Sequence, residues 1–448
     1  MTDFENVLLL NNNYLVIDAN YNFNHNHNVS NNIFDNLINN FCGQIIYSNE
    51  FDKLFELNNS SNKLIYLCGN IINLFNELFR NSLNYHNLIS HKYQIIDIFS
   101  YYDNLNLSSD IDFKIIKIGQ IPFNVKNIGV YFKNYFDSNV DYFKNISNEH
   151  VFQTLTESNK KSNAFRNGIY LTPIVSESKS ESNLNSESKS EEKLHFKLLR
   201  CSSNFDGPTD NFRNTDNSIL ESLNSISKYF FNCEFELNHV LAQIYNNFSH
   251  ENNKSSKAKI KAHSDKTKDM QKNGIMAFCT FYDFSNINIS DLSNIKLDNF
   301  DYYYNIIHPS NSILTKLRFK LKSDIVDQSK FIDTFDIVLY PNSVFIMSLK
   351  TNRLYTHEII PSFLPIYLLP IRMGYVVRCS NRNAYFYNGQ TYIKYDDDAN
   401  YTPLHEMTLN EMINVKKSYY EENTTSLTIN YPNIYSSMNK GDYMKPNL

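Results

Sequence analysis

The sequence predicts a mainly β fold, in which an antiparallel sandwich or barrel follows a smaller N-terminal α/β region. Between residues 231 and 390, short runs rich in Val, Ile, Phe, Tyr and Thr alternate with polar loops, and no helical stretch separates them. Many short strands without intervening helices are typical of antiparallel folds. Before residue 115, apolar runs such as LVID and KLIYLCG indicate buried strands, and residues 75–89 have the apolar spacing of a helix.

Composition limits the class of protein. The chain has 448 residues and a formal net charge of −5, which excludes a globally basic nucleic-acid coat protein but leaves room for a local basic groove. Aromatic residues make up 15% of the chain, enough to build a core and to argue against global disorder. Six cysteines without a CxxC pair suit a reducing compartment, so we expect the protein in the cytoplasm or nucleus. The most apolar stretch, 359–377, contains three prolines and Arg372, so we expect no membrane span.

Changes in composition divide the chain into three predicted parts. We expect an α/β region of unknown role at 1–115, a β-rich domain at 116–395, and a peripheral C-terminal tail at 396–448, where strand periodicity is lost. Polar insertions interrupt the middle part, and they bury too little apolar surface to offset their chain entropy. These insertions are a disordered Ser/Glu/Lys-rich loop at 176–193, a lysine-rich loop at 249–272 and a third segment at about 286–310.

The motif His263-Ser264-Asp265 is a candidate metal site. In an extended segment, residues two apart face the same side, so the imidazole and the carboxylate can converge on one ion. His357, on a later apolar strand, can supply a third ligand. Two histidines and one carboxylate are the facial triad of non-haem Fe(II) oxygenases. The alternative is that His263 and Asp265 are ordinary members of a lysine-rich solvated loop.

Two arginines flank the strand that follows His357. Arg372 and Arg378 enclose Met-Gly-Tyr-Val-Val, and a spacing of six along a strand puts both side chains on one face. A buried arginine in an apolar strand is rare unless it meets an anion, and its planar fork suits a carboxylate. The sequence therefore predicts a site for a dicarboxylate, with a structural salt bridge for one of the pair as the alternative.

These motifs, in this order, resemble the AlkB-like Fe(II)/2-oxoglutarate-dependent dioxygenase family over roughly residues 120–390. The resemblance implies that His263, Asp265 and His357 bind the metal. It also implies that Arg372 holds the distal carboxylate of 2-oxoglutarate and that Arg378 lies near the proximal one. The other residues matched to the co-substrate site are Tyr245, in the run LAQIY, and Gln243, which stands where the family has Asn.

The resemblance implies a double-stranded β-helix, a jelly-roll-like oxygenase core with flanking helices. Its cofactors would be Fe(II), 2-oxoglutarate as co-substrate, and O₂, and its reaction would couple decarboxylation of 2-oxoglutarate to oxidation of a substrate. The stretches between Tyr245 and His263 and between Asp265 and His357 are longer than in the family. Both extra lengths are polar, so we expect surface insertions.

The function that we expect is oxidative demethylation of alkylated nucleic-acid bases by a monomer with no membrane association. Single-stranded or methylated nucleic acid would be the partner, because a basic rim suits phosphates and aromatic rings can stack on a flipped base. One alternative is a 2-oxoglutarate-dependent hydroxylase of a protein side chain, lipid or small metabolite. Another is a catalytically dead β-barrel that serves as an interaction module. The predicted substrate contacts are Lys257, Lys259, Lys261, Phe165 and Tyr170.

Overall fold

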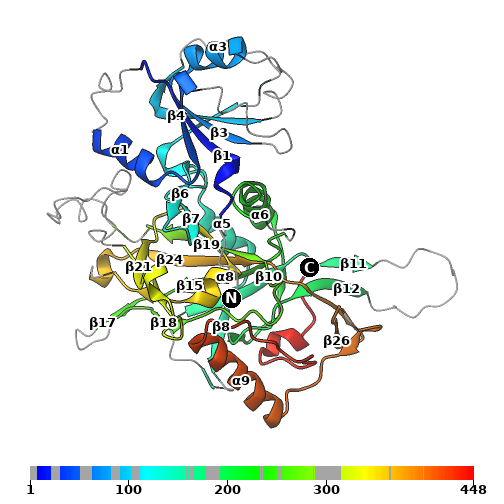
Figure 1. Ribbon diagram of the computed structural model, residues 1–448. Coiled ribbons are helices and arrows are strands. Elements are labelled where there is room, and N and C mark those ends of the chain that lie inside the picture. Colours follow the sequence, from blue (N-terminus) through cyan, green and yellow to red (C-terminus); the bar gives the residue numbers. More distant parts are fainter. Residues whose placement is uncertain are drawn as a thin grey trace.

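Figure 1 shows the computed structural model of the chain, coloured from the N-terminus in blue to the C-terminus in red. Phe165, most of the loop predicted at 176–193 and most of the insertion predicted at 286–310 lie outside the described residues. The structure describes residues 8–21, 31–50, 63–81, 91–102, 111, 113–157, 160–161, 166–177, 192–232, 234, 236–249, 255–285, 287, 314–362, 365–396 and 398–448.

The N-terminal part contains a parallel sheet with strand order β2-β1-β3-β4-β5. Its inner strands β1 and β3 are largely apolar and buried, because both of their faces are covered. The face of Tyr14 and Val16 packs under Leu74 of α3, while that of Leu15 and Ile17 packs with Leu37 of α1. Its elements are β1 (Asn13–Ile17), α1 (Asn31–Asn40), β2 (Gln44–Tyr47), β3 (Leu64–Asn70), α3 (Ile71–Asn81), β4 (Lys92–Tyr101) and β5 (Phe113–Ile116).

The helix expected at 75–89 begins four residues earlier, at Ile71, and residues 82–90 lie outside the described part.

A large, mainly antiparallel sheet forms the centre of the molecule, with strand order β13-β8-β10-β15-β24-β19-β22-β7-β6. Two short strands, β9 and β14, pair with β8 and β10 at its side. Its strands are β6 (Phe123–Val125), β7 (Gly129–Phe132), β8 (Gln153–Glu157), β9 (Lys160–Lys161), β10 (Arg166–Thr172), β13 (Asn204–Phe205), β14 (Asp210–Asn211), β15 (His239–Tyr245), β19 (Ile275–Asp283), β22 (Ser343–Ser348) and β24 (Ile371–Arg378).

A four-stranded antiparallel sheet, with order β18-β23-β20-β21, packs against one face of the central sheet. Side chains of the central strands alternate between its two faces. Met276 and Phe278 of β19 share a core with Phe319 of the smaller sheet. The bounds are β18 (Ile260–His263), β20 (Lys316–Leu321), β21 (Thr334–Val338) and β23 (Tyr355–Ile360), with the short helix α8 (Leu349–Leu354) between β22 and β23.

Helices cover the opposite face of the central sheet. Ala277 of β19 and Val377 of β24 pack in one cluster with Ile146 of α5 (Tyr142–Glu149) and Leu223 of α6 (Asn214–Ser227). The chain therefore has a mainly β core built of facing antiparallel sheets, as the sequence predicts. No helix in the described part of the chain is long and apolar enough to cross a membrane.

A third sheet and the C-terminal segment complete the fold. The sheet has the order β11-β12-β25-β26-β27, and a small hairpin, β16–β17, precedes β18. The remaining elements are β11 (Val175–Glu177), β12 (Lys193–Leu198), β16 (Phe248–Ser249), β17 (Ser255–Ser256), β25 (Arg382–Tyr387), β26 (Gln390–Lys394), β27 (Thr402–Pro403) and α9 (Leu409–Thr424).

The prediction of a peripheral tail at 396–448 is wrong. Arg200 is fully buried and forms a two-pronged ion pair with Asp269, at 2.9 Å from Nε and 2.7 Å from Nη2. Its remaining Nη1 donates to the backbone carbonyls of Ile434 and Ser436. A buried guanidinium needs partners for all its donors, and the tail supplies two of them. The segment is thus part of the packed interior, which local periodicity could not reveal.

A buried histidine joins the helical layer to the central sheet. The His150 ring lies after α5, with Nδ1 2.8 Å from Asp210 and Nε2 2.7 Å from Asp216. Asp216, in the first turn of α6, also accepts from the hydroxyl of Tyr375 on β24. Burial lowers the pKa of His150, but the hydrogen bonds and charges of the two carboxylates outweigh it and raise this pKa to about 9. His150 is therefore an imidazolium at neutral pH.

This network predicts a stability that falls at alkaline pH. The folded-state pKa of His150 lies above the unfolded value of about 6.5, so its contribution is complete below about pH 6.5 and is lost as the pH rises through about 9. The free energy of unfolding, measured with urea between pH 6 and 9.5, should decline with rising pH in the wild type and less steeply in His150→Gln. Equal slopes in the two proteins would contradict the assignment.

Candidate functional site

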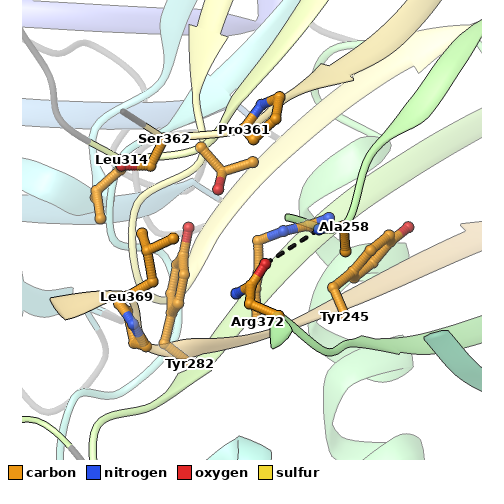
Figure 2. A pocket seen from close by; sticks show the side chains of 11 residues that line it. Tyr245, Ala258, Tyr282, Leu314, Pro361, Ser362, Leu369 and Arg372 are labelled. Atoms are coloured by element: carbon orange, nitrogen blue, oxygen red, sulfur yellow. Dashed lines mark hydrogen bonds between the residues drawn. The ribbon is translucent and has the colours of Figure 1, made fainter. Parts of the chain in front are cut away.

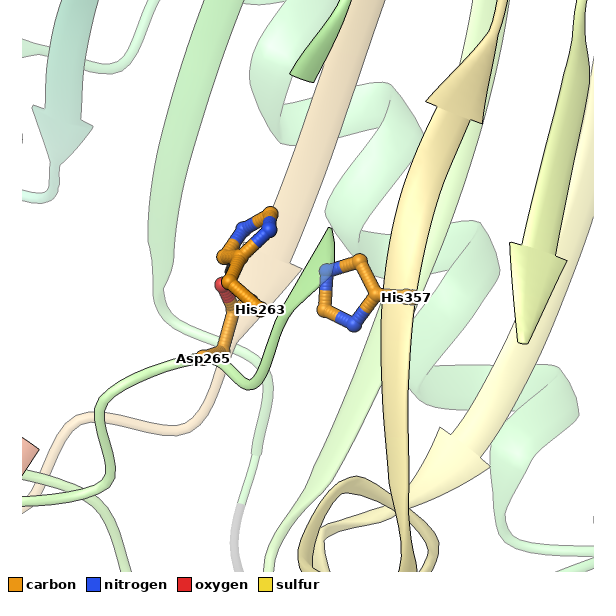
Figure 3. Close-up of side chains that lie close together, drawn as sticks. All are labelled: His263, Asp265 and His357. Atoms are coloured by element: carbon orange, nitrogen blue, oxygen red, sulfur yellow. Dashed lines mark ion pairs between the residues drawn. The ribbon is translucent and has the colours of Figure 1, made fainter. Parts of the chain in front are cut away.

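Three predicted metal ligands converge between the two facing sheets. His263 ends β18 and lies directly opposite His357 of β23 in the antiparallel register. Asp265 follows two residues after His263, in the loop that leaves the strand. One ligand atom from each residue lies within 4.8 Å of the other two, and Figure 3 shows the three side chains turned toward a common space. The alternative of an ordinary solvated loop does not suit Asp265, which is buried, while His263 is partly exposed.

Both imidazoles are in the neutral form that a metal ligand needs. Nδ1 of His263 donates to the carbonyl of Lys261 at 2.8 Å. The proton of the neutral ring is therefore on Nδ1, and Nε2 keeps its lone pair. The His357 ring packs against Phe278 and Phe319, and its Nδ1 has no partner among the described residues. Burial lowers the pKa of both histidines, and burial together with the nearby His263 brings the pKa of His357 to about 3. Neutral imidazoles bind metals without first releasing a proton.

Asp265 is held as a carboxylate by Arg378 of β24. Nε and Nη2 of Arg378 both donate to Oδ2 of Asp265, at 3.0 and 2.8 Å. Burial raises the pKa of Asp265, but the charge and hydrogen bonds of Arg378 outweigh it, so the pKa lies well below its usual range. The other oxygen, Oδ1, stays 3.8 Å from Nε2 of His263. Arg378 thus forms the salt bridge weighed as an alternative from sequence, and it does so with a candidate metal ligand.

The backbone of Asp265 is fixed by a residue that sequence reasoning missed. Asn352 of α8 is fully buried, and its Oδ1 accepts from the Asp265 N–H at 2.9 Å. Its Nδ2 donates to the Asp265 carbonyl, also at 2.9 Å. A local signal for this role is lacking, because Asn352 lies 87 residues away in sequence.

Arg372 lies at the other end of the same face of β24, beside a small hollow. Its side chain is buried, its guanidinium carbon lies 3.9 Å from the centre of the Tyr245 ring, and its Nη2 has no hydrogen-bond partner within the described part of the chain. In the register of the sheet it lies between Tyr245 of β15 and Tyr282 of β19. Figure 2 shows this arrangement, with Pro361 and Ser362 also lining the hollow.

Gly374 leaves room for the stacked side chains of Arg372 and Tyr245. A Cβ at this position would lie 3.1 Å from Nη1 of Arg372 and 3.2 Å from a ring carbon of Tyr245. Glycine inside a strand often marks a place where another group comes close, so the sequence itself could have indicated this close approach. Gln243, opposite Gly374, accepts from the Tyr245 hydroxyl at 3.2 Å, and its Nε2 has no partner among the described residues. The predicted co-substrate residues therefore lie on one face of adjacent strands.

Two of the predicted substrate residues are aromatic, Tyr170 and Phe165. Tyr170 is buried in the core between the sheets, against Phe205, and donates to the Ser203 carbonyl, so it has no face for a flipped base and this prediction is wrong. Phe165 lies outside the described residues.

The lysine-rich segment is not a single solvated rim. Lys259 and Lys261 are exposed, while Lys257 donates to the Ser362 carbonyl at 2.7 Å, beside the hollow. Lys266 and Lys268, which follow the candidate metal ligands, are buried. Within the described part of the segment, Lys259, Lys261 and Lys272 therefore present positive charge at the surface.

Comparison with known proteins gives distant likenesses only. No family model matches the sequence, and no curated protein matches it. Among solved structures, a prolyl-4-hydroxylase from Pseudomonas putida matches at 8% identity over 53% of this chain and 82% of its own, with a TM-score of 0.26. OsALKBH1 matches at 10% identity over 56% of this chain and 97% of its own, with a TM-score of 0.30. Scores this low carry no argument about function, which has to come from the site itself.

If these residues form a divalent-metal centre, its affinity for the metal should depend on His357. His357→Ala should weaken Mn²⁺ binding, measured by isothermal titration calorimetry, by more than about 100-fold, beyond the usual effect of losing an outer-shell partner. His195→Ala is the matched control, since this histidine is partly exposed in the third sheet. Wild-type affinity in His357→Ala would rule out the centre.

Proposed function

We propose that this protein is an Fe(II)- and 2-oxoglutarate-dependent oxygenase. The observation that carries the proposal is the convergence of His263, Asp265 and His357, beside a face that bears a buried arginine with an unpaired donor. Two neutral imidazoles and one ionised carboxylate fit Fe(II), and they leave coordination positions open on one side. The two facing sheets suit the double-stranded β-helix that this class uses.

The polar side chains on this face also support a co-substrate site. A buried guanidinium with an unsatisfied Nη2 calls for an anion, and a carboxylate can take two parallel hydrogen bonds from it. Arg372 would therefore bind the distal carboxylate of 2-oxoglutarate, with the Tyr245 hydroxyl and the Gln243 amide beside it. Nη1 of Arg378 also has no hydrogen-bond partner in the described part of the chain, and we propose that it would donate to the proximal carboxylate near Asp265.

When bound, iron, 2-oxoglutarate and O₂ supply the oxidation, which yields succinate and CO₂ and oxidises a C–H bond of the substrate. The protein's own residues position and protect this chemistry. Arg378 and Asn352 fix the carboxylate and the backbone of Asp265, so that only one oxygen is left for the metal. Phe278 and Phe319 enclose the His357 ring and exclude water from that side.

Arg372 provides the test of the co-substrate site. Arg372→Ala should raise the 2-oxoglutarate concentration needed for half-maximal succinate formation by roughly 100-fold, because it removes two charge-assisted hydrogen bonds worth about 3 kcal/mol. Arg372→Lys should recover only part of this loss, since lysine cannot form the two-pronged contact.

Arg318→Ala is the control for this pair, because Arg318 pairs with Asp336 in the smaller sheet and is partly exposed. A normal 2-oxoglutarate requirement in Arg372→Ala would remove Arg372 from the site.

For the substrate, we propose an alkylated nucleic-acid base that is demethylated by oxidation. The support is electrostatic: Lys259 and Lys261 are exposed on the segment that leads into His263, so two positive charges border the metal site. Phosphates of a single strand would be attracted to them. The hydroxylase of a protein side chain, lipid or metabolite and the inactive interaction module become outcomes of the experiment.

Replacing Lys259 and Lys261 with Gln should flatten the salt dependence of oligonucleotide binding. For single strands the slope of log K against log salt is about −0.7 per phosphate contact, so the change should be about 1.4. Fluorescence anisotropy measures the slope, and Lys416→Gln with Lys417→Gln, both exposed on α9, is the matched control.

Formaldehyde release from methylated oligonucleotides decides the substrate class. Release supports the demethylase. Succinate formation with a peptide, lipid or metabolite but none with oligonucleotides would replace it with the hydroxylase, and no turnover with any of them would favour the interaction module.

A further inference from the structure

The C-terminal end of α9 lies against the loop that carries the candidate metal ligands. Oδ1 of Asn423 accepts from the backbone N–H of Ser264 at 2.9 Å. Oε1 of Glu422 accepts from the backbone N–H of Thr267 at 3.0 Å. These contacts join segments 159 and 155 residues apart in sequence. Ser264 is the residue between His263 and Asp265, so one of the two contacts falls inside the ligand motif itself.

Together with Asn352, these side chains hold three backbone amides of one short loop. Ser264, Asp265 and Thr267 each donate to a side-chain oxygen from outside the loop. A loop without regular structure leaves its amides to water or to such acceptors. Each fixed amide restricts the direction in which the neighbouring side chain leaves the backbone.

The end of α9 is itself held firmly. The last carbonyls of a helix lack partners within the helix, and cations are favoured there. Nζ of Lys322 donates to the carbonyls of Glu422 and Thr425 at 2.7 and 3.0 Å. Nζ of Lys266 donates to the Tyr419 carbonyl at 3.1 Å and to Oδ1 of Asn423 at 2.6 Å. Two buried lysines thus fill the helix end, and one of them comes from the metal-ligand loop.

Glu422 is shared between the loop and the segment after the helix. It is buried, and while Oε1 serves Thr267, Oε2 accepts from the hydroxyl of Tyr431 at 2.6 Å. Its carboxylate therefore cannot turn away without losing bonds on both sides. At the start of α9, Thr408 and Glu411 form a capping box that fixes the opposite end.

We propose that the end of α9 positions the metal ligands, with Asn423 and Glu422 as positioning residues of the site. Metal affinity depends on ligand atoms being held close to their bound geometry, and outer partners that fix them matter nearly as much as the ligands. The C-terminal segment after residue 396 then helps to position the residues of the metal centre. This inference rests on the metal role proposed for His263, Asp265 and His357.

The first experiment measures Mn²⁺ affinity by calorimetry. Asn423→Ala should weaken binding by about 10- to 100-fold. Asn423→Asp should bind Mn²⁺ as the wild type does, because it keeps the oxygen that accepts from Ser264 and Lys266. Asn414→Ala, on an exposed face of the same helix, should change nothing. Wild-type affinity in Asn423→Ala, or equal weakness in Asn423→Asp, would overturn the proposal.

The second experiment does not depend on a metal. Amide hydrogen exchange in the metal-free protein should show Ser264 protected in the wild type and in Asn423→Asp, and exchanging at least about 10-fold faster in Asn423→Ala, since a lost hydrogen bond of about 1.4 kcal/mol is a factor of ten. An unprotected Ser264 in the wild type would overturn the contact, even if Asn423→Ala fails to fold. A wild type that binds no Mn²⁺ but protects Ser264 would instead count against the proposed function alone.

Discussion

The buried ion pair between Asp265 and Arg378 is the interaction on which the rest of the site depends. It ties the loop after β18, in the smaller sheet, to β24, the strand between β15 and β19 in the central sheet. Elsewhere the two sheets meet largely through apolar side chains, which set a spacing but no direction, and Tyr131 of β7 donates a hydrogen bond to the Val338 carbonyl of β21. A carboxylate that accepts two bonds on one oxygen has a fixed direction, and the other oxygen is presented to the space shared with both histidines.

The same arrangement repeats four residues further along both segments. Asp269 lies four residues after Asp265, and it pairs with Arg382, four residues after Arg378, as well as with Arg200. Breaking such a pair by removing one partner leaves an uncompensated buried charge, which is strongly destabilising. The loop from 265 to 269 is therefore fixed at both ends by charge, and α9 closes it from outside. These buried ion pairs of Asp265 and Asp269 fix the geometry of the loop rather than add stability.

Much of the fold and of the candidate site could be predicted from the sequence. The residues that could not be predicted share a physical cause. The candidate metal ligands could be predicted because His263 and Asp265 are two residues apart in an extended segment and a second His follows on a later apolar run. Arg372 was readable because a charged residue in an apolar strand needs a partner. The role of Asn352, and that of Asn423, was not, because each acts through one contact with a residue far away in sequence. Tyr170 was misread for the same reason, since periodicity does not say which core a strand residue enters. Lys266 looked solvated beside its neighbours, and its burial depends on carbonyls at the end of α9.

The most direct test of the central claim is anaerobic addition of Fe(II) and then 2-oxoglutarate to the purified protein, followed by visible absorption spectroscopy. If His263, Asp265 and His357 hold the metal and Arg372 holds the co-substrate, a weak charge-transfer band of the chelate should appear with 2-oxoglutarate. Succinate, which lacks the keto acid, should give no band. A folded protein that binds Fe(II) but gives no band at saturating 2-oxoglutarate would contradict the account.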